Sequence, residues 1–367
     1  MKGIRFLKKN AVFCIAALAA LITCFFVPPD RAYLDYFDWK TLSCLFLTLA
    51  VICALRNILF FTILARKLVT VAGNLRSLFL LLITITFIGS MIIANDMALI
   101  TFLPLGYFAL SVVKKEKYMA YLFVLQNISA NLGGMLTPFG NPQNLYLYSY
   151  FDIPTGEFMG IMLPAFLIAV TLLVLACLPI RPVRFTIDQK FGKKLDTPKT
   201  VLYLVLFFLS ILIVFRVIPF VLGLIVIPVI LFFVDRRSLK MVDYGLLGTF
   251  FFFFIFAGNL SRIEAVNDLL SRLLEKDTLL VSVFTCQFIS NVPTAILLSR
   301  FTGDYAPLLL GVNIGGTGTL IASLASLITF NEFKILHPEQ TKKYLGIFAA
   351  ANAAFLLILT LAAKLFL

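Results

Sequence analysis

Residues 131–144 read Asn-Leu-Gly-Gly-Met-Leu-Thr-Pro-Phe-Gly-Asn-Pro-Gln-Asn, and residues 313–326 read Asn-Ile-Gly-Gly-Thr-Gly-Thr-Leu-Ile-Ala-Ser-Leu-Ala-Ser. Both stretches place glycines and side-chain amides or hydroxyls in the middle of otherwise apolar segments of membrane length. Hydrocarbon offers no partner to unwound backbone or to polar side chains, so such stretches are costly there. Two similar interruptions in one chain indicate a transporter with a midplane site built from two broken helices. For one interruption alone, glycines that serve tight helix packing are the alternative.

The composition is that of an all-α polytopic membrane protein. Hydrophobic residues make up 61% of the 367 residues and charged residues 13%, whereas soluble domains have about 45–50% and about 25%. The six cysteines are scattered and there is one histidine, so we expect no metal site, no catalytic triad and no cofactor. The net charge of +13 fits basic cytoplasmic loops, and we expect no nucleic-acid partner.

The apolar pattern predicts roughly 9–11 spans. Residues 1–39 combine a basic start with an apolar run at 11–27, which we expect to remain as an uncleaved transmembrane helix. Residues 181–242 are predicted to form a cytoplasmic linker, 181–199, and two connecting spans. The other predicted spans and apolar pieces are 42–59, 77–93, 97–113, 158–180, 245–258, 278–289, 295–299 and 344–367.

Two segments repeat one order of elements. Residues 40–180 and 243–367 each contain a span, an amphipathic stretch, a hairpin, a broken helix and a final span. The hairpin tips are predicted at 94–98 and 290–294, and the broken helices at 118–150 and 306–330. Residues 295–299 are far too short for a crossing helix, which favours re-entrant hairpins over pairs of full crossings.

The basic residues orient this map. Most of the 31 lysines and arginines fall on one predicted face, formed by the N-terminus, 65–76, 114–117, 181–199, 235–240 and the polar loop 331–343. That excess marks the face as cytoplasmic. The first unit then starts outside and the second inside, which makes them inverted repeats. Full crossings in place of the hairpins would leave this orientation unchanged.

We expect the two tips and the two breaks to converge on one site. Freed N–H groups at half-helix N-termini suit an anion, and freed carbonyls at half-helix C-termini suit a small cation such as sodium. No lysine or arginine lies in these elements. The predicted substrate-binding residues are Asn95, Thr137, Asn141, Asn144, Ser290, Asn291, Thr294, Thr319 and Ser323. The predicted coupling-ion residues are Asp96, Asn131, Gly133, Asn313 and Gly315.

Asp96 is the one carboxylate in these four elements. Carboxylates within a membrane are costly and mark functional sites by default, so it could carry a coupling proton or help to bind sodium. The alternative is a hairpin-tip cap that accepts N–H bonds from the following helix. The second unit has Val292 at the corresponding position, so the two tips are not chemically equal.

These motifs resemble the ion-transporter superfamily, which includes arsenite permeases, citrate and dicarboxylate transporters and sodium/proton antiporters. Ala-Asn95-Asp96-Met-Ala-Leu is similar to the first hairpin motif of the arsenite-permease and citrate branches, and Ser290-Asn291-Val-Pro-Thr294 to the second. The resemblance covers residues 40–367. It implies a scaffold domain, a mobile transport domain, elevator-type alternating access and a homodimer. Ala94 and Asp96 stand where the dicarboxylate branch has Ser and Thr, so dicarboxylate specificity is not carried over.

The sequence therefore predicts a secondary transporter in the cytoplasmic membrane, surrounded by lipid, with its N-terminus in the cytoplasm. Its predicted substrate is a small anion or carboxylate, coupled to sodium or protons. An arsenite exporter and a sodium/proton antiporter are the alternatives within transport. A membrane-embedded enzyme would need a nucleophile with a base or a metal cluster, and a passive channel would need a continuous polar lining.

Overall fold

The computed structural model describes residues 11–69, 71–185 and 195–367, and its regular elements there are helical, apart from one isolated β-bridge between Asn74 and Arg184. The first part of the chain forms α2 (Ala11–Phe26), η1 (Arg31–Tyr36), α3 (Trp39–Asn57), α4 (Phe60–Val69), α5 (Leu75–Ile93), α6 (Asn95–Val112), η2 (Glu116–Tyr118), α7 (Met119–Gly133), η3 (Gly134–Leu136), α8 (Pro142–Tyr150) and α9 (Thr155–Cys177). The remainder forms α10 (Thr197–Val214), α11 (Phe220–Val234), α12 (Arg236–Met241), α13 (Tyr244–Ser261), α14 (Glu264–Ile289), α15 (Asn291–Leu298), α16 (Tyr305–Ile314), α17 (Leu324–Leu336), η4 (Pro338–Gln340) and α18 (Thr341–Phe366).

The apolar helices confirm the predicted class. Among the described residues, seven helices are long and apolar enough to cross a membrane, namely α3, α5, α6, α9, α10, α13 and α18. The shorter apolar helices α2, α11 and α16 accompany them. The chain is therefore an all-α polytopic membrane protein.

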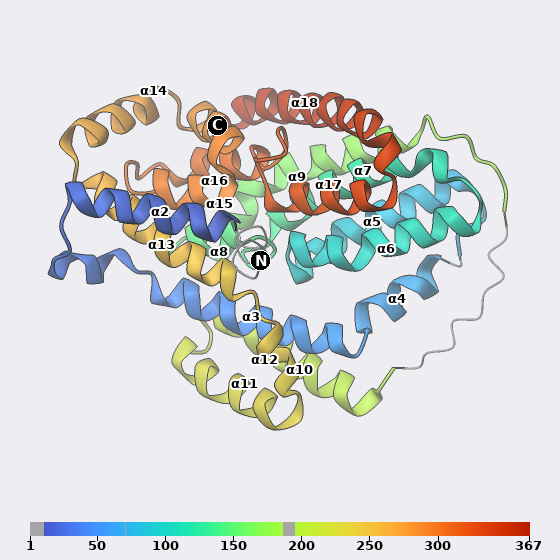
Figure 1. The fold of residues 1–367 in the computed structure, drawn as a ribbon, viewed down its shortest axis with the longest axis horizontal. Helices are drawn as coiled ribbons and strands as arrows, with labels where there is room; N and C mark the ends of the chain where they lie inside the picture. Colours follow the sequence, from blue (N-terminus) through green and yellow to red (C-terminus); the bar gives the residue numbers. More distant parts are fainter. Residues whose placement is uncertain (1–10, 70, 186–194) are drawn as a thin grey trace.

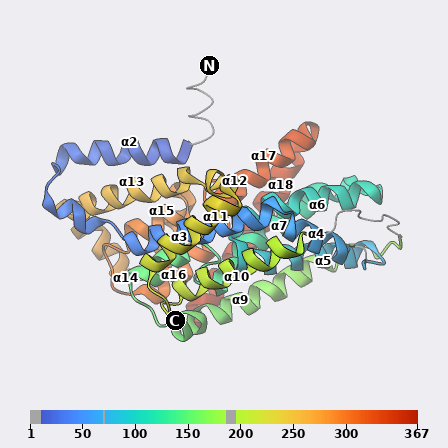
Figure 2. The same cartoon turned by 90° about the horizontal axis from the view of Figure 1, so that it is seen from below.

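The helices form two groups that exchange their broken segments. Figure 1 places α5 and α6 toward one end of the long axis and α15 and α16 toward the other. The second half of each broken segment packs on the opposite group: α8 contacts α15 and α16, and α17 contacts α6 and α7. Figure 2 shows α3, α10 and α11 together, and these helices contact one another beside the two groups.

Both predicted hairpin tips are turns of a single residue with the same rare backbone conformation. Ala94 joins α5 to α6 with φ 63° and ψ 153°, and Ser290 joins α14 to α15 with φ 75° and ψ 158°. This region is essentially reserved for glycine, and other residues occupy it only where the surrounding packing imposes it. The strain at two corresponding positions indicates that both turns are held by the same kind of contact.

The two hairpins differ in the length of their arms. A kink at Asp277 divides α14 in the interval predicted between 261–276 and 278–289, and α15 has only 8 residues. The arms of the first hairpin, α5 and α6, have 19 and 18 residues and are long enough to cross a membrane. The length of the arms therefore favours a re-entrant hairpin for α14 and α15. For α5 and α6 it does not discriminate between a re-entrant hairpin and two full crossings.

The predicted polar loop at 331–343 is wrong. Helix α17 continues to Leu336, and α18 already begins at Thr341. The segment is amphipathic: Phe333 is buried and stacks on Tyr344 with ring centroids 4.6 Å apart, while its charged neighbours remain near the surface. The connection is therefore only residues 337–340, and the other polar residues of the segment belong to the ends of α17 and α18.

Four of the segments predicted to share a basic face adjoin in pairs. Leu75 donates its N–H to the carbonyl oxygen of Val183 at 3.0 Å, which joins segments 65–76 and 181–199. Lys343 Nζ lies 3.5 Å from the carbonyl oxygen of Lys117, which joins segments 331–343 and 114–117. The basic residues predicted at the N-terminus within 1–10, together with Lys190, Lys193 and Lys194, lie outside the described residues.

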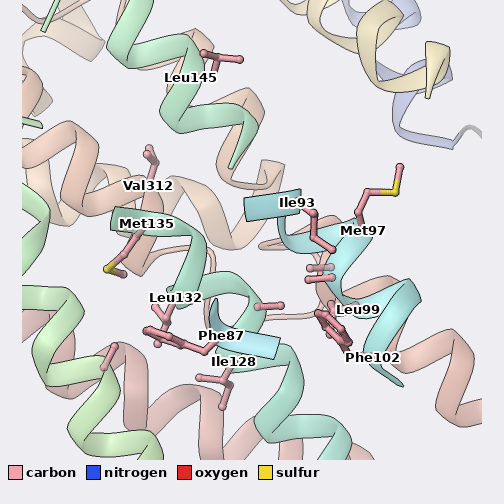
Figure 3. Packing of buried hydrophobic residues seen from close by; sticks show 14 of the residues in the cluster. Phe87, Ile93, Met97, Leu99, Phe102, Ile128, Leu132, Met135, Leu145 and Val312 are labelled. Carbon is pink, nitrogen blue, oxygen red and sulfur yellow. The ribbon is translucent and has the colours of Figure 1, made fainter. Parts of the chain in front are cut away.

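A continuous buried hydrophobic cluster holds the breaks in place. Figure 3 shows the part of it contributed by α5, α6, α7, α8 and α16, including Phe87, Phe102, Leu132 and Val312. These residues are nearly or completely inaccessible to water. The asparagines of the two breaks are buried beside this packing, whereas Thr137 is partly buried and Thr319 is exposed.

Candidate functional site

A glycine lets each broken segment lie against the first arm of its hairpin. A Cβ atom added at Gly133 would clash with the carbonyl oxygen of Phe87 and with Ser90 Oγ on α5. A Cβ at Gly315 would lie 2.9 Å from Cys286 Sγ on α14. Both helices lose their regular backbone just after this close approach, as the sequence predicts for glycines in an apolar segment.

The two broken segments bond to each other through side chains at corresponding positions. Ser323 Oγ donates to Asn131 Oδ1 at 2.8 Å, and Asn141 Nδ2 donates to Asn313 Oδ1 at 3.3 Å. In each bond an asparagine from the first half-helix of one segment meets the residue just before the second half-helix of the other. All four residues are buried. The contact is therefore reciprocal.

Further amides close the crossing around Asn313. Its Nδ2 donates to Asn144 Oδ1 at 2.6 Å, and its Oδ1 also accepts from Gln143 Nε2 at 3.3 Å. Asn144 Nδ2 in turn donates to the carbonyl oxygen of Gly134 at 3.0 Å, within the unwound part of its own segment. The network thus ties freed backbone of the first break to the second broken segment.

The second half-helices begin at the crossing without conventional caps. Asn141 precedes α8 and Ser323 precedes α17, and neither side chain accepts a hydrogen bond from its own helix. Both side chains are used in the bonds across the crossing instead. Pro142 has no N–H, so the groups left without a side-chain cap are the Gln143 N–H in α8 and the first N–H groups of α17, which carry partial positive charge.

Threonines fasten each break to the hairpin before it. Thr137 Oγ1 donates to the carbonyl oxygen of Met91 at 2.8 Å, and Thr319 Oγ1 donates to that of Gln287 at 3.0 Å. The acceptors lie three residues before the strained turns at Ala94 and Ser290. The two predicted threonines therefore hold equivalent places, each beside its own hairpin.

The hairpin tips reach the breaks through asparagines. Asn95 Nδ2 donates to Asn131 Oδ1 at 3.2 Å, and the Asn291 N–H donates to the carbonyl oxygen of Ala322 at 2.9 Å. Each asparagine also accepts from the next residue's N–H, at 2.9 Å in both tips. Ser290 Oγ lies 3.3 Å from the carbonyl oxygen of Ala322, whereas Thr294 Oγ1 bonds within its own hairpin to the carbonyl oxygen of Ser290.

Asp96 lies apart from this amide network and lines a small cavity. The cavity has a volume of about 70 Å³, and α3 and the start of α13 supply its opposite wall, including Thr48 and Asp243. Asp96 Oδ1 is buried and has no hydrogen-bond partner among the described residues. The side chain of Asp96 does not cap α6, because the start of this helix has no side-chain cap. The N–H of Asp96 itself donates to Asn95 Oδ1.

Several polar residues of the site were not among the predicted ones. Asp243 is exposed at the cavity mouth and accepts the N–H of Leu246 at the start of α13. Gln287 Nε2 donates to the carbonyl oxygen of Gly315 at 2.9 Å, and Asn127 Nδ2 donates to Ser326 Oγ at 3.2 Å. An amide within an apolar run was the available signal, a single one for Gln287 and the pair Gln126-Asn127 for Asn127.

Comparisons with known proteins show that this chain is similar to membrane transporters. The family model described as citrate transporter matches residues 4–307. The uncharacterized transporter MJ0456 of Methanocaldococcus jannaschii is 34% identical over 295 residues, which are 80% of either chain. The inner membrane protein YbiR of Escherichia coli is 28% identical over 338 residues, which are 89% of this chain and 88% of that protein.

Proposed function

Since this chain belongs to the citrate transporter family and is a multi-pass membrane transporter, we propose that it moves a small anion or carboxylate across the cytoplasmic membrane by secondary active transport. Sodium or protons would drive the movement. The proposal takes the crossing of the two broken segments as the substrate site and Asp96 as the coupling residue.

The reciprocal bonds Asn131–Ser323 and Asn141–Asn313 are the observation that carries this proposal. They bring the N-termini of α8 and α17 and the C-termini of α7 and α16 to one buried place. Helix N-termini attract anions, and helix C-termini with free carbonyls attract cations. A site of this kind can hold an anion and its coupling ion together without a lysine or arginine. Neutral donors also favour release, which transport requires.

The shared geometry of the two units supports inverted repeats and an elevator mechanism. The strained tips Ala94 and Ser290, the close glycines Gly133 and Gly315, and the two threonine bonds recur in the same order. In this proposal α5–α8 and α14–α17 move as one body against α2, α3, α10, α11 and α13. The cavity beside Asp96 lies between these two bodies, where such a movement would change its access to water.

A sodium/proton antiporter is the second candidate. The buried, unpartnered Oδ1 of Asp96 favours it, because an isolated carboxylate within a membrane needs either a proton or a cation. Asp243 faces the same cavity and would add to the attraction for a cation. Exchange of protons for sodium would then proceed without an anionic substrate.

Uptake by proteoliposomes distinguishes these functions. Succinate, citrate, phosphate, sulfate and arsenite would be tested with and without inward sodium and proton gradients, against liposomes without protein. The proposal predicts that at least one anion accumulates and that a gradient stimulates it. If no anion accumulates while sodium and protons exchange rapidly, the anion proposal is wrong and the antiporter is favoured.

A further inference from the structure

A larger cavity lies beside the hairpin tip and carries positive charge. It has a volume of about 250 Å³ and lies between α6 and the junction of α3 with α4. We call it the outer cavity, and the cavity beside Asp96 the inner cavity. The polar side chains of the outer cavity are Arg56, Thr62, Arg66 and Thr101, and its remaining lining is apolar.

Within the part of the chain that the structure describes, the guanidinium of Arg56 has no anionic partner. Its Nη1 lies 2.9 Å from the sulfur of Met97, and among the described residues Arg56 forms no ion pair. A thioether is a weak acceptor that carries no charge, so this contact leaves the arginine charge uncompensated. A half-buried guanidinium at the end of an apolar helix is well suited to bind a carboxylate or phosphate, which it can hold with two parallel hydrogen bonds.

The outer cavity adjoins the inner one. Ile100 lines both cavities, and Met97, which lines the inner cavity, touches Arg56 in the outer cavity. The two cavities also have lining residues that are neighbours in sequence, since Met241 lines the outer cavity and Asp243 lines the inner one. An anion held at Arg56 would therefore be one side chain away from the carboxylate-lined inner cavity and the hairpin tip.

We propose that the outer cavity is an anion-binding vestibule in which Arg56 recruits a molecule bearing a carboxylate or phosphate before it reaches the crossing. The role of the vestibule in recruiting substrate rests on the proposed anion transport. Binding of an anion at Arg56 does not itself require transport. The apolar lining of the outer cavity, which includes Leu105 and Phe108, suits an anion with a short hydrocarbon portion. Arsenous acid, which is uncharged at neutral pH, would gain nothing from this arginine.

The charge of the vestibule can be measured by labelling a cysteine placed in it. Thr101→Cys would be introduced into a chain whose six native cysteines are replaced by alanine. Its modification rates by an anionic reagent (sulfonatoethyl methanethiosulfonate) and a cationic one (trimethylammonioethyl methanethiosulfonate) would be compared in phosphatidylcholine vesicles. Removing a nearby unit charge changes the two rates in opposite directions, so Arg56→Gln should lower the anionic-to-cationic rate ratio by at least about tenfold.

Two variants control for indirect effects. Arg56→Lys keeps the charge and should keep most of the rate ratio. Arg272→Gln removes an arginine whose side chain is 79% exposed on α14, away from the lining of the vestibule, and should leave the ratio unchanged. An unchanged ratio in Arg56→Gln would overturn the proposal.

Protection from labelling identifies the source of the anion. Citrate or phosphate should slow the labelling of Thr101→Cys in phosphatidylcholine vesicles, and Arg56→Gln should abolish that protection. Protection that requires phosphatidylglycerol, with none from citrate or phosphate, would assign the cavity to a lipid headgroup and overturn the vestibule. Because labelling needs no transport, these results stand apart from a failure to detect uptake.

Discussion

Replacing Asn313 with alanine should destabilise the protein by about 3.5 kcal/mol, because this side chain joins three residues of the other broken segment. The bond to Asn144 at 2.6 Å contributes about 1.5 kcal/mol, and the two bonds at 3.3 Å from Asn141 and Gln143 contribute about 0.5 kcal/mol each. The Gln143 amide then loses its partner, and its Oε1 is already buried without one, which adds about 1 kcal/mol.

Thermal unfolding in detergent measures this effect. An unfolding entropy of about 2.1 cal/mol/K per residue gives about 1.3 °C for each kcal/mol in a chain of this size, so the midpoint should fall by about 4.5 °C. Asn352→Ala is the matched control, because the bonds of that buried amide do not run between the two broken segments: it donates at 2.9 Å to Phe348 within its own helix and accepts from the Gly318 N–H at 3.5 Å. It should lower the midpoint by only about 1 °C. A loss in Asn313→Ala no larger than in the control would refute the crossing as a network between the two segments.

Three further perturbations follow from the same geometry. Gly133→Ala should destabilise the protein by about 1–3 kcal/mol, because the added Cβ clashes with α5. In the same unfolding assay Gly160→Ala, where a Cβ meets nothing within 4 Å, should be neutral or stabilise the protein by up to about 1 kcal/mol. Asp96→Asn removes a buried charge without breaking a side-chain hydrogen bond among the described residues, so it should leave the unfolding midpoint unchanged or raise it. The same variant should abolish the stimulation of uptake by an ion gradient. Stimulation equal to wild type would exclude Asp96 from coupling. Arg262 bonds to Asp30 at 2.6 Å and lowers the pKa of that carboxyl below its ordinary value of 3.8, so Asp30→Asn should lower the midpoint at pH 7, and its difference from wild type should shrink as the pH falls below about 4. A difference as large at pH 3 as at pH 7 would contradict this.

The sequence predicts the breaks and turns of this fold because their causes are local. Glycine, proline and asparagine within apolar runs weaken a helix wherever they occur, which explains the interruptions after Gly133 and Ile314. The kink at Asp277 also has a local cause, since Asp277 stands where the charged stretch gives way to an apolar one and accepts the N–H of Leu280, as a helix N-cap does. The segment 331–343 was misread because a polar helix face and a polar loop have similar compositions.

The partners of the site residues depend on tertiary packing and could not be read from the chain. The sequence predicts that the two breaks converge, but Asn131 and Ser323 are almost 200 positions apart and nothing in either neighbourhood specifies that these two residues pair. Asp243 was missed because a carboxylate at the start of a helix ordinarily serves as a cap, which it also does here. Its place opposite Asp96 follows only from the packing of α13 beside the hairpin tip.

The concentration dependence of anion uptake in Ser323→Ala tests most directly whether the crossing binds substrate. Ser323 Oγ makes one bond across the crossing, so its loss leaves the protein folded, whereas a lost contact of about 1.4 kcal/mol to the anion would raise KM about tenfold. Ser261→Ala, which removes a bond at the end of α13, is the control and should keep the wild-type KM. The account predicts a KM at least about tenfold higher in Ser323→Ala alone. Equal KM values in both variants and the wild type would contradict it.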